Sequence, residues 1–208
     1  EIVLLGAATI AASSGSDTII GSSGNDRIVA GGGDSLSGGE GNDIFLSGSG
    51  TDSYDGGGGV DTLSFEGIAF AANVDLALNL VMNDGSGSGF NETITGVENL
   101  IGWDMADFLR GDGADNSNAG GGGGDSLQGR GGADTLDGNA GADTITGGDG
   151  DDLYYVESAG DRVTEISGAG SGTDRVISAI TVTLGANVEN LTLAAVTAAP
   201  AFAATHHK

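Results

Sequence analysis

The stretch Gly129–Tyr155 reads GRGGADTLD, GNAGADTIT and GGDGDDLYY, which are three consecutive units of nine residues. Each unit approximates the form G-G-x-G-x-D-x-U-x, in which U is a large apolar residue. Three further units of this form occur earlier in the chain, at Gly21–Val29, Gly38–Leu46 and Gly56–Ser64. A fixed period of this kind indicates a structure of stacked repeats.

The sixth-position aspartate keeps this period through two blocks, residues 12–64 and 102–155. Every step is nine residues except the one from Asp26 to Asp34, because Ala30–Ser37 is one residue short. The sixth positions are Asp17, Asp26, Asp34, Asp43, Asp52 and Asp61 in the first block, and Asp107, Asn116, Asp125, Asp134, Asp143 and Asp152 in the second. The U position, two residues later, is apolar or aromatic in every unit except one, which has Asn118. A flexible Gly/Ser/Asp linker would not keep both the aspartate and the apolar residue at a fixed place from unit to unit.

The composition follows from the repeat and excludes several classes of function. The 208 residues include 42 glycines, with 30 acidic against 6 basic residues and a net charge of −24. Such a surface repels the phosphate backbone, which excludes nucleic acid as a partner. The chain has no cysteine, hence no disulfide framework, and no apolar run reaches the roughly 18 residues that a membrane span needs. It has neither H-E-x-x-H nor G-x-S-x-G, so we expect no enzyme.

The spacing of the unit suits calcium binding. Calcium takes about six to eight hard oxygen ligands. Glycines permit positive φ, so loop carbonyls can turn toward one point, and the aspartate adds a carboxylate. The next three residues suit a short strand with U pointing inward. Two units then form one coil, so Asp17, Asp34 and Asp52 line one edge and every second unit, beginning at Asp26, lines the other.

We therefore predict calcium ions between stacked loops, about four in each block and about eight in all. The predicted ligands are the sixth-position residues and loop glycines. These glycines are Gly24, Gly39, Gly41, Gly57 and Gly59 in the first block, and Gly121, Gly123, Gly132, Gly141, Gly148 and Gly150 in the second. Asn116 and Asn118 fall in one unit and predict a weak or empty site there. His206 and His207 are adjacent and predict no metal site.

These units resemble the RTX (repeats-in-toxin) calcium-binding nonapeptide repeats, over just more than half of the chain. The resemblance implies an all-β fold, a right-handed parallel β-roll (β-solenoid). It also implies secretion, since similar proteins of Gram-negative bacteria are exported unfolded by type I secretion and fold outside the cell with calcium. The expected location is extracellular or at the cell surface, with the rest of a larger secreted protein as partner.

Five segments are expected along the chain. They are a first RTX block (1–66), a β spacer that continues the coil without calcium (67–101), a second RTX block (102–156), a β extension or cap (157–193) and a disordered tail (194–208). A linker between independent domains is the alternative for 65–101. Ala12–Ile20 and Gly102–Arg110 keep the aspartate but depart from the loop-glycine pattern, so we expect each to cap the start of its block.

Outside the blocks the pattern changes. Apolar and polar residues alternate over Asn73–Leu80, which predicts a half-buried strand, and 83–89 predicts a loop. Strands are also expected at Val156–Glu165 and Asp174–Leu184. The string VENL occurs at 97–100 and at 188–191, each time downstream of a block. This indicates a larger unit that recurs, and with a start at Glu1 rather than Met it suggests a piece of a longer array.

The sequence thus predicts a non-enzymatic, calcium-binding β-roll module that folds outside the cell and serves a larger protein as a structural and secretion-folding element. One alternative is the C-terminal repeat region of a secreted exoenzyme, of protease, lipase or alginate epimerase type, with its catalytic domain absent. Another is an adhesin or surface-layer segment that binds polysaccharide. Carboxylate spacing alone does not exclude a glycosidase pair.

Overall fold

The structure is a computed structural model that describes residues 2–3, 6–83, 92–166, 170 and 172–194. Its strands form two sheets. Sheet A contains, in spatial order, β1 (Ile2–Val3), β3 (Thr18–Ile20), β5 (Ser35–Glu40), β7 (Ser53–Gly58), β11 (Glu92–Thr95), β10 (Leu80–Asn83), β9 (Asn73–Asp75), β13 (Phe108–Arg110), β15 (Ser126–Gly131), β17 (Thr144–Asp149) and β19 (Arg162–Thr164). Sheet B contains β2 (Thr9–Ala11), β4 (Arg27–Val29), β6 (Ile44–Leu46), β8 (Thr62–Ser64), β12 (Asn99–Ile101), β14 (Ser117–Gly123), β16 (Thr135–Gly141), β18 (Leu153–Val156), β20 (Arg175–Ser178) and β21 (Asn190–Leu193). Across these ranges, no helix is long and apolar enough to span a membrane.

The short strands arise from the x-U-x segment of each unit. Side chains alternate along a strand, so in β4 Ile28 is fully buried while Arg27 and Val29 are partly exposed. The inward U residues, each at most 2% exposed, are Ile19, Ile28, Leu36, Phe45, Tyr54, Leu63, Leu109, Leu127, Leu136, Ile145 and Tyr154. They form one core between the two sheets, and burial stabilises the fold by roughly 1.5–3 kcal/mol for each large apolar side chain.

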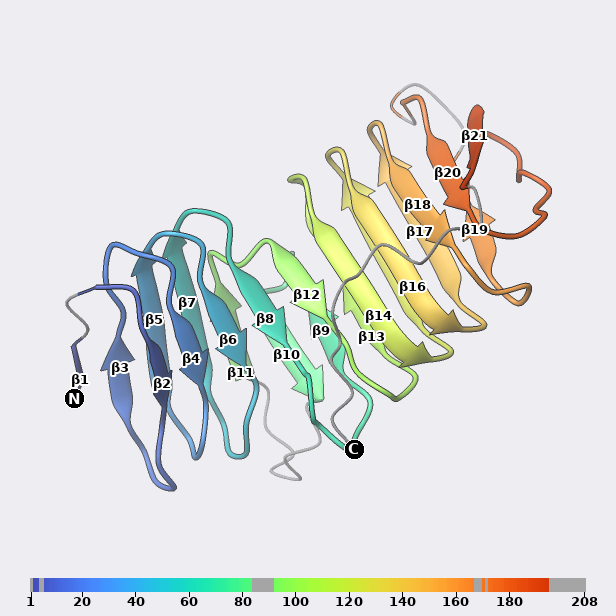
Figure 1. Cartoon of the computed structure of the whole chain (residues 1–208). Coiled ribbons are helices and arrows are strands. Elements are labelled where there is room, and N and C mark those ends of the chain that lie inside the picture. Colours follow the sequence, from blue (N-terminus) through green and yellow to red (C-terminus); the bar gives the residue numbers. More distant parts are fainter. Residues whose placement is uncertain (1, 4–5, 84–91, 167–169, 171, 195–208) are drawn as a thin grey trace.

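Consecutive units alternate between the sheets, so each unit pairs in parallel with the unit two places later. Ile28 lies opposite Phe45, and Leu127 lies opposite Ile145. The result is a parallel β-solenoid of about ten turns. Figure 1 shows its strands following one another along the length of the solenoid, from blue at the N-terminus to orange. The predicted all-β, parallel β-roll with two blocks of repeats is confirmed.

The spacer enters sheet A as a three-stranded meander. Strand β11 is parallel to β7 and β9 is parallel to β13, while β10 runs antiparallel between β9 and β11. In sheet B, β12 alone pairs in parallel with β8 on one side and β14 on the other. The sheets therefore continue from the first block to the second without a break.

The prediction of one strand over Asn73–Leu80 is wrong. The strand ends at Asp75, and Leu76–Asn79 forms a tight turn before β10. The Asp75 carboxylate accepts a hydrogen bond from the Leu78 N–H (3.2 Å), and the Asn79 N–H donates to the Leu76 carbonyl (3.0 Å). Asn79 has a φ of 56°, a conformation that asparagine tolerates in turns. The predicted loop over 83–89 begins at the end of β10 and otherwise lies outside the described residues.

The meander gives the two sheets unequal lengths at the junction. Sheet A has three strands between β7 and β13, whereas sheet B has one between β8 and β14. At about 4.8 Å per strand, sheet A is longer here by roughly 10 Å. The solenoid must therefore bend toward sheet B, and in Figure 1 the array changes direction between β8 and β14.

An ion pair ties the spacer to the second block. Both Arg130 guanidinium nitrogens Nη1 and Nη2 donate to the Asp75 carboxylate at 2.6 Å, and Nη1 also donates to the Gly111 carbonyl at 2.8 Å. Burial would raise the pKa of Asp75, but Arg130 outweighs it and the pKa is lowered. Arg130 has a φ of 84° at a glycine position of its unit. This strained backbone is held by a contact 55 residues away in sequence.

The C-terminal extension adds strands that are shorter than expected. Strand β19 covers three residues of the predicted Val156–Glu165, and β20 covers four residues of Asp174–Leu184. Strand β21, which contains the second VENL asparagine, pairs in parallel with β20. The predicted disordered tail lies outside the described residues beyond Ala194.

Candidate metal centre

The sixth-position residues form two columns, one on each edge of the solenoid. The sheet A column contains Asp17, Asp34, Asp52, Asp107, Asp125 and Asp143; the sheet B column contains Asp26, Asp43, Asp61, Asn116, Asp134 and Asp152. Within each block, the Oδ1 atom of each member accepts a hydrogen bond from the backbone N–H of the member one coil earlier, at 2.7–2.9 Å. All except Asp17 are at most 4% exposed.

The second carboxylate oxygen, Oδ2, distinguishes two kinds of loop. In open loops, the residue four before the aspartate has a positive φ, and Oδ2 is buried without a hydrogen-bond partner among the described residues. The open loops end at Asp43, Asp61, Asp125, Asp134, Asp143, Asp152 and Asp174. Their backbones pair from coil to coil beyond the strand core, as Gly39 does with Gly57.

In closed loops, a backbone N–H just before the aspartate satisfies Oδ2. Trp103 donates to Asp107 at 2.8 Å, and Ser22 donates to Asp26 at 2.8 Å. The other closed loops end at Asp17, Asp34 and Asp161. The loop before Asp34 is the one that is a residue short, and there the donor is Gly31, three positions earlier.

The Asn116 loop is also closed. The Asn116 Oδ1 accepts from the Asp112 N–H (2.9 Å), and its Nδ2 donates to the Glu98 carbonyl (2.8 Å). The amide therefore replaces carboxylate–ion contacts with hydrogen bonds inside the protein. Asn118 is buried in the same unit, and its Oδ1 accepts from the Leu100 N–H at 3.0 Å. A weak or empty site at this unit stays a prediction.

Oxygen atoms of stacked open loops converge on a space that only glycine leaves free. A Cβ at Gly38 would overlap the Asp43 carboxylate and lie 2.6 Å from the Gly56 carbonyl oxygen of the next coil. A Cβ at Gly129 would likewise meet the carboxylate of its own unit and a carbonyl of the next. Buried carboxylate oxygens without partners, next to carbonyl oxygens, form the hard donor set that calcium prefers. The residues present therefore fit calcium.

Comparison with protein families matches the RTX calcium-binding nonapeptide repeat (4 copies) to residues 5–35, 31–63 and 119–154. The chain contains RTX calcium-binding nonapeptide repeats. The matched residues hold all seven open loops except the one before Asp174. RTX repeats bind Ca²⁺ and are typical of secreted bacterial proteins. No curated protein gave a match to the chain.

The electrostatics of the RTX columns oppose folding without a cation. Burial, and then neighbouring carboxylates, raise the pKa of Asp125 and Asp152 to about 7. The same causes raise the pKa of Asp61 and Asp134 to about 6. A divalent ion between the loops would displace the protons that these buried carboxyls retain near neutral pH. The carboxylates would then be charged and bound to the ion.

Most of the predicted loop glycines have the backbone that an open RTX loop needs. Positive φ is found at Gly39, Gly41, Gly57, Gly59, Gly121, Gly123, Gly132, Gly148 and Gly150. Gly24 and Gly141 do not have it, so the prediction of a positive φ at these two glycines is wrong. Gly24 belongs to the closed loop of Asp26. In the unit of Gly141, positive φ is found at the second position, Asn139 (60°), and not at the fourth, Gly141.

Sequence reasoning missed the residues that extend the RTX columns beyond the nonapeptides. The Glu98 carboxylate accepts from the Asp61 N–H at 2.8 Å, and the Glu189 carboxylate accepts from the Asp174 N–H at 2.9 Å. These are the glutamates of the two VENL strings, so each string continues the sheet B column. Glu92 accepts from the Asp52 N–H (3.4 Å) in the sheet A column.

Alanine at an open-loop glycine should be strongly destabilising. Gly57 has a φ of 97°, and an added Cβ would collide with the Gly39 carbonyl oxygen. We expect Gly57→Ala to lower the free energy of unfolding in saturating calcium by about 2 kcal/mol or more. Gly113→Ala is the matched control, because its added Cβ meets nothing within 4 Å, and it should change stability by less than about 0.5 kcal/mol. Urea unfolding measures both, and equal losses would contradict the assignment.

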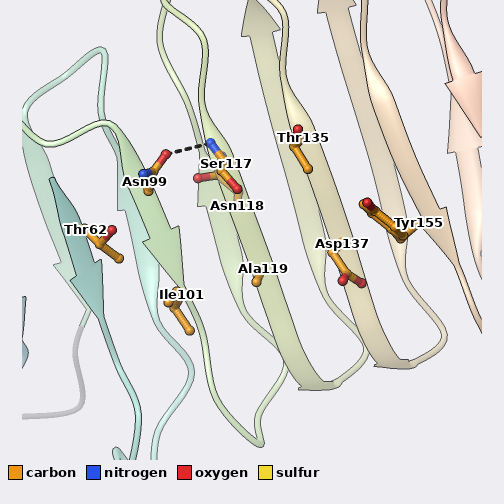
Figure 2. A pocket seen from close by; sticks show the side chains of 9 residues that line it. All are labelled: Thr62, Asn99, Ile101, Ser117, Asn118, Ala119, Thr135, Asp137 and Tyr155. Atoms are coloured by element: carbon orange, nitrogen blue, oxygen red, sulfur yellow. Dashed lines mark hydrogen bonds between the residues drawn. The ribbon is translucent and has the colours of Figure 1, made fainter. Parts of the chain in front are cut away.

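A separate hollow lies on the outer face of sheet B at the bend. It has a volume of about 240 Å³. Figure 2 shows its lining, which comes from neighbouring strands and is Thr62, Asn99, Ile101, Ser117, Asn118, Ala119, Thr135, Asp137 and Tyr155. Hydroxyl, amide and carboxylate groups line the hollow, and the Tyr155 ring lies at one end of it. The hollow lies on the inner side of the bend, where sheet B is the shorter sheet.

Proposed function

We infer that this chain is a calcium-dependent structural module of a larger secreted or cell-surface protein. It folds outside the cell when Ca²⁺ enters its RTX loops. The observation that carries the proposal is the set of seven buried aspartates whose Oδ2 atoms have no hydrogen-bond partner among the described residues. An unpartnered buried carboxylate is costly, and these lie in columns where one ion can serve two loops.

The energetics make folding depend on the ion. Each nine-residue unit except that of Asn118 buries one large apolar U side chain, while ordering the glycine-rich loops costs backbone entropy. The carboxylate columns add repulsion at neutral pH. Calcium binding offsets both terms, so its binding free energy becomes folding free energy. A chain that stays unfolded inside the cell and folds in calcium outside suits the secretion route of RTX proteins.

Three gaps between open loops of the matched repeats are ready for an ion. They lie where two open loops follow each other in one column, at Asp43 and Asp61, at Asp125 and Asp143, and at Asp134 and Asp152. These gaps should fill first. The total of about eight ions stays a prediction and requires the closed loops to open as well.

The proposal assigns this segment no catalytic step. The same module could serve as the repeat region of a secreted exoenzyme, and the sequence that flanks it in the parent protein would decide between the two. A zincin or hydrolase motif in that flanking sequence would support the exoenzyme.

Circular dichroism in chelator and in calcium tests the proposal. We expect a coil-like spectrum in chelator and a β-rich spectrum at about millimolar calcium, the range of extracellular calcium modules. Magnesium at the same concentration should be much less effective, because it requires near-ideal octahedral geometry and retains its waters. A β-rich spectrum that is the same in chelator and in calcium would refute the proposal.

Polysaccharide binding is a second candidate function, favoured by the hollow at the bend. Its hydroxyl and amide groups suit hydrogen bonding with a sugar, and the Tyr155 ring at one end of the hollow suits stacking. We expect glycan-array binding in calcium, lost on Tyr155→Ala and lost in chelator together with the fold. Absence of binding in calcium, or retention by Tyr155→Ala, would contradict this function and leave the calcium module untouched.

A further inference from the structure

We propose that Asp152, Glu165 and Asp174 form an additional divalent-cation site that locks the C-terminal extension onto the last RTX loop. One carboxylate oxygen from each residue lies within 4.8 Å of the other two. The site lies beyond the matched repeats and differs from theirs because Glu165 places a side-chain carboxylate where an RTX unit has glycine. It rests on the proposed function, since it extends the same sheet B column.

Two of these carboxylates are buried and aimed at the site without another use for their second oxygen. Asp152 is 1% exposed and Asp174 is fully buried. Each uses Oδ1 to accept a backbone N–H of the coil before, from Asp134 at 2.8 Å and from Asp152 at 2.9 Å. Both Oδ2 atoms have no hydrogen-bond partner within the part of the chain that the structure describes. The Tyr154 hydroxyl beside Asp152 is also buried and without a partner there.

The strand register explains why a glutamate occupies the third corner. Strands β17 and β19 pair Thr146 with Thr164, so the next residues, Gly147 and Glu165, occupy equivalent positions. In an RTX unit this first position is glycine, and it offers only a carbonyl. Here it carries a carboxylate, which accepts from the Gly147 N–H at 3.1 Å and the Gly148 N–H at 3.3 Å.

At the end of the repeats, the Glu165 carboxylate therefore takes the place of the backbone carbonyl that a first-position glycine offers in an RTX loop. Three carboxylates and a phenol oxygen are hard donors, which select calcium or a similar divalent cation rather than a soft metal. One ion there would join β18, the end of β19 and the start of β20. The extension, which carries few buried apolar residues, would then depend on this ion for its order.

Calorimetric titration of the full chain with Ca²⁺, combined with hydrogen exchange, tests the site. We expect Glu165→Gln to bind one fewer ion than the wild-type chain and to exchange faster in β20 and β21, with exchange in the RTX blocks unchanged. Glu66→Gln is the matched control, an exposed glutamate outside the two columns, and it should behave as the wild type. A wild-type ion count and wild-type exchange in Glu165→Gln would overturn the proposal.

If Glu165→Gln does not fold at any calcium concentration, Glu165→Asp decides: recovery of folding and of the wild-type ion count supports the site, and failure to recover overturns it. A wild-type chain that folds in chelator would refute the calcium-dependent module. The ion-count difference between the wild type and Glu165→Gln would still report on this site separately.

Discussion

Replacing Asp125 with asparagine should raise the calcium concentration for half-maximal folding by about tenfold or more, which corresponds to roughly 1.4 kcal/mol. Asparagine keeps the Oδ1 acceptor that binds the Asp107 N–H. It replaces the buried, unpartnered Oδ2 with the amide nitrogen Nδ2, whose lone pair is delocalised and does not bind a cation. Calcium affinity depends on the number of charged ligands, so this loss is large.

The same substitution should have the opposite effect in chelator. Burial first, then Asp143 and Asp107, raise the pKa of Asp125, so its charge opposes the metal-free fold. Asp125→Asn removes that charge and should increase residual β structure without calcium. A variant that merely damaged the fold would lose structure in both conditions.

Calcium titrations followed by far-ultraviolet circular dichroism measure both effects. Asp104→Asn is the control, because it makes the same change of charge at an exposed carboxylate outside the columns. We expect Asp104→Asn to leave the calcium midpoint nearly unchanged. Equal shifts for the two variants would mean that net charge, and not ligation by the column, sets the calcium requirement.

The period of nine was enough to predict the core and the columns. Ile145 and Tyr154 point inward because U follows the aspartate by two residues, and Asp125 and Asp143 share an edge because two units make a coil. The offset from aspartate to U and the alternation of units between the two edges are set within the repeat, and the stacking of coils does not change them. For this reason the parallel solenoid could be predicted without knowledge of its neighbours.

Features that depend on contacts between distant coils could not be read in this way. Arg130 occupies a glycine position, and its backbone conformation is held by Asp75 on the meander. The VENL strings were visible as repeats, but their glutamates act by accepting the N–H of residues such as Asp61. The alternation over 73–80 fits a strand or a hairpin equally, and only the turn at Asn79 decides.

Whether a loop is open or closed is the most consequential feature that the sequence concealed. The closed loop of Asp26 and the open loop of Asp43 both follow the glycine pattern in outline. Ser22 stands where Gly39 stands, and its N–H and hydroxyl both reach Asp26 Oδ2. A residue at that position which donates locally satisfies the carboxylate, whereas a residue with positive φ leaves it for an ion.

Without calcium, the chain should lose β structure as the pH rises from about 5 to 8. Burial and neighbouring carboxylates raise the pKa to about 7 for Asp125 and Asp152, and to about 6 for Asp61 and Asp134. Between an ordinary aspartate pKa of about 4 and these values, the folded chain binds more protons than the unfolded chain. The stability that these carboxyls contribute is therefore fully present below about pH 4 and is lost as the pH rises through 6–7.

Calcium-depleted buffers are preferable to chelators for this measurement, because chelators lose affinity in acid. Circular dichroism between pH 5 and 8, at low protein concentration, stays above the sequence pI of about 4.1. The increase in order toward pH 5 should be smaller in Asp125→Asn, which lacks one of the titrating groups, and unaltered in Asp104→Asn. Metal-free β structure that grew with pH would contradict the sign derived from the pKa shifts.

The calcium-bound chain should show the opposite slope. Protons and calcium compete for the same carboxylate oxygens, so binding releases protons wherever the folded pKa lies near the working pH. The calcium concentration for half-maximal folding should thus fall as the pH rises from 5 to 8. Opposite slopes in the two conditions identify one set of groups as both the proton sites and the calcium ligands, because an unrelated titration would move both conditions in the same direction.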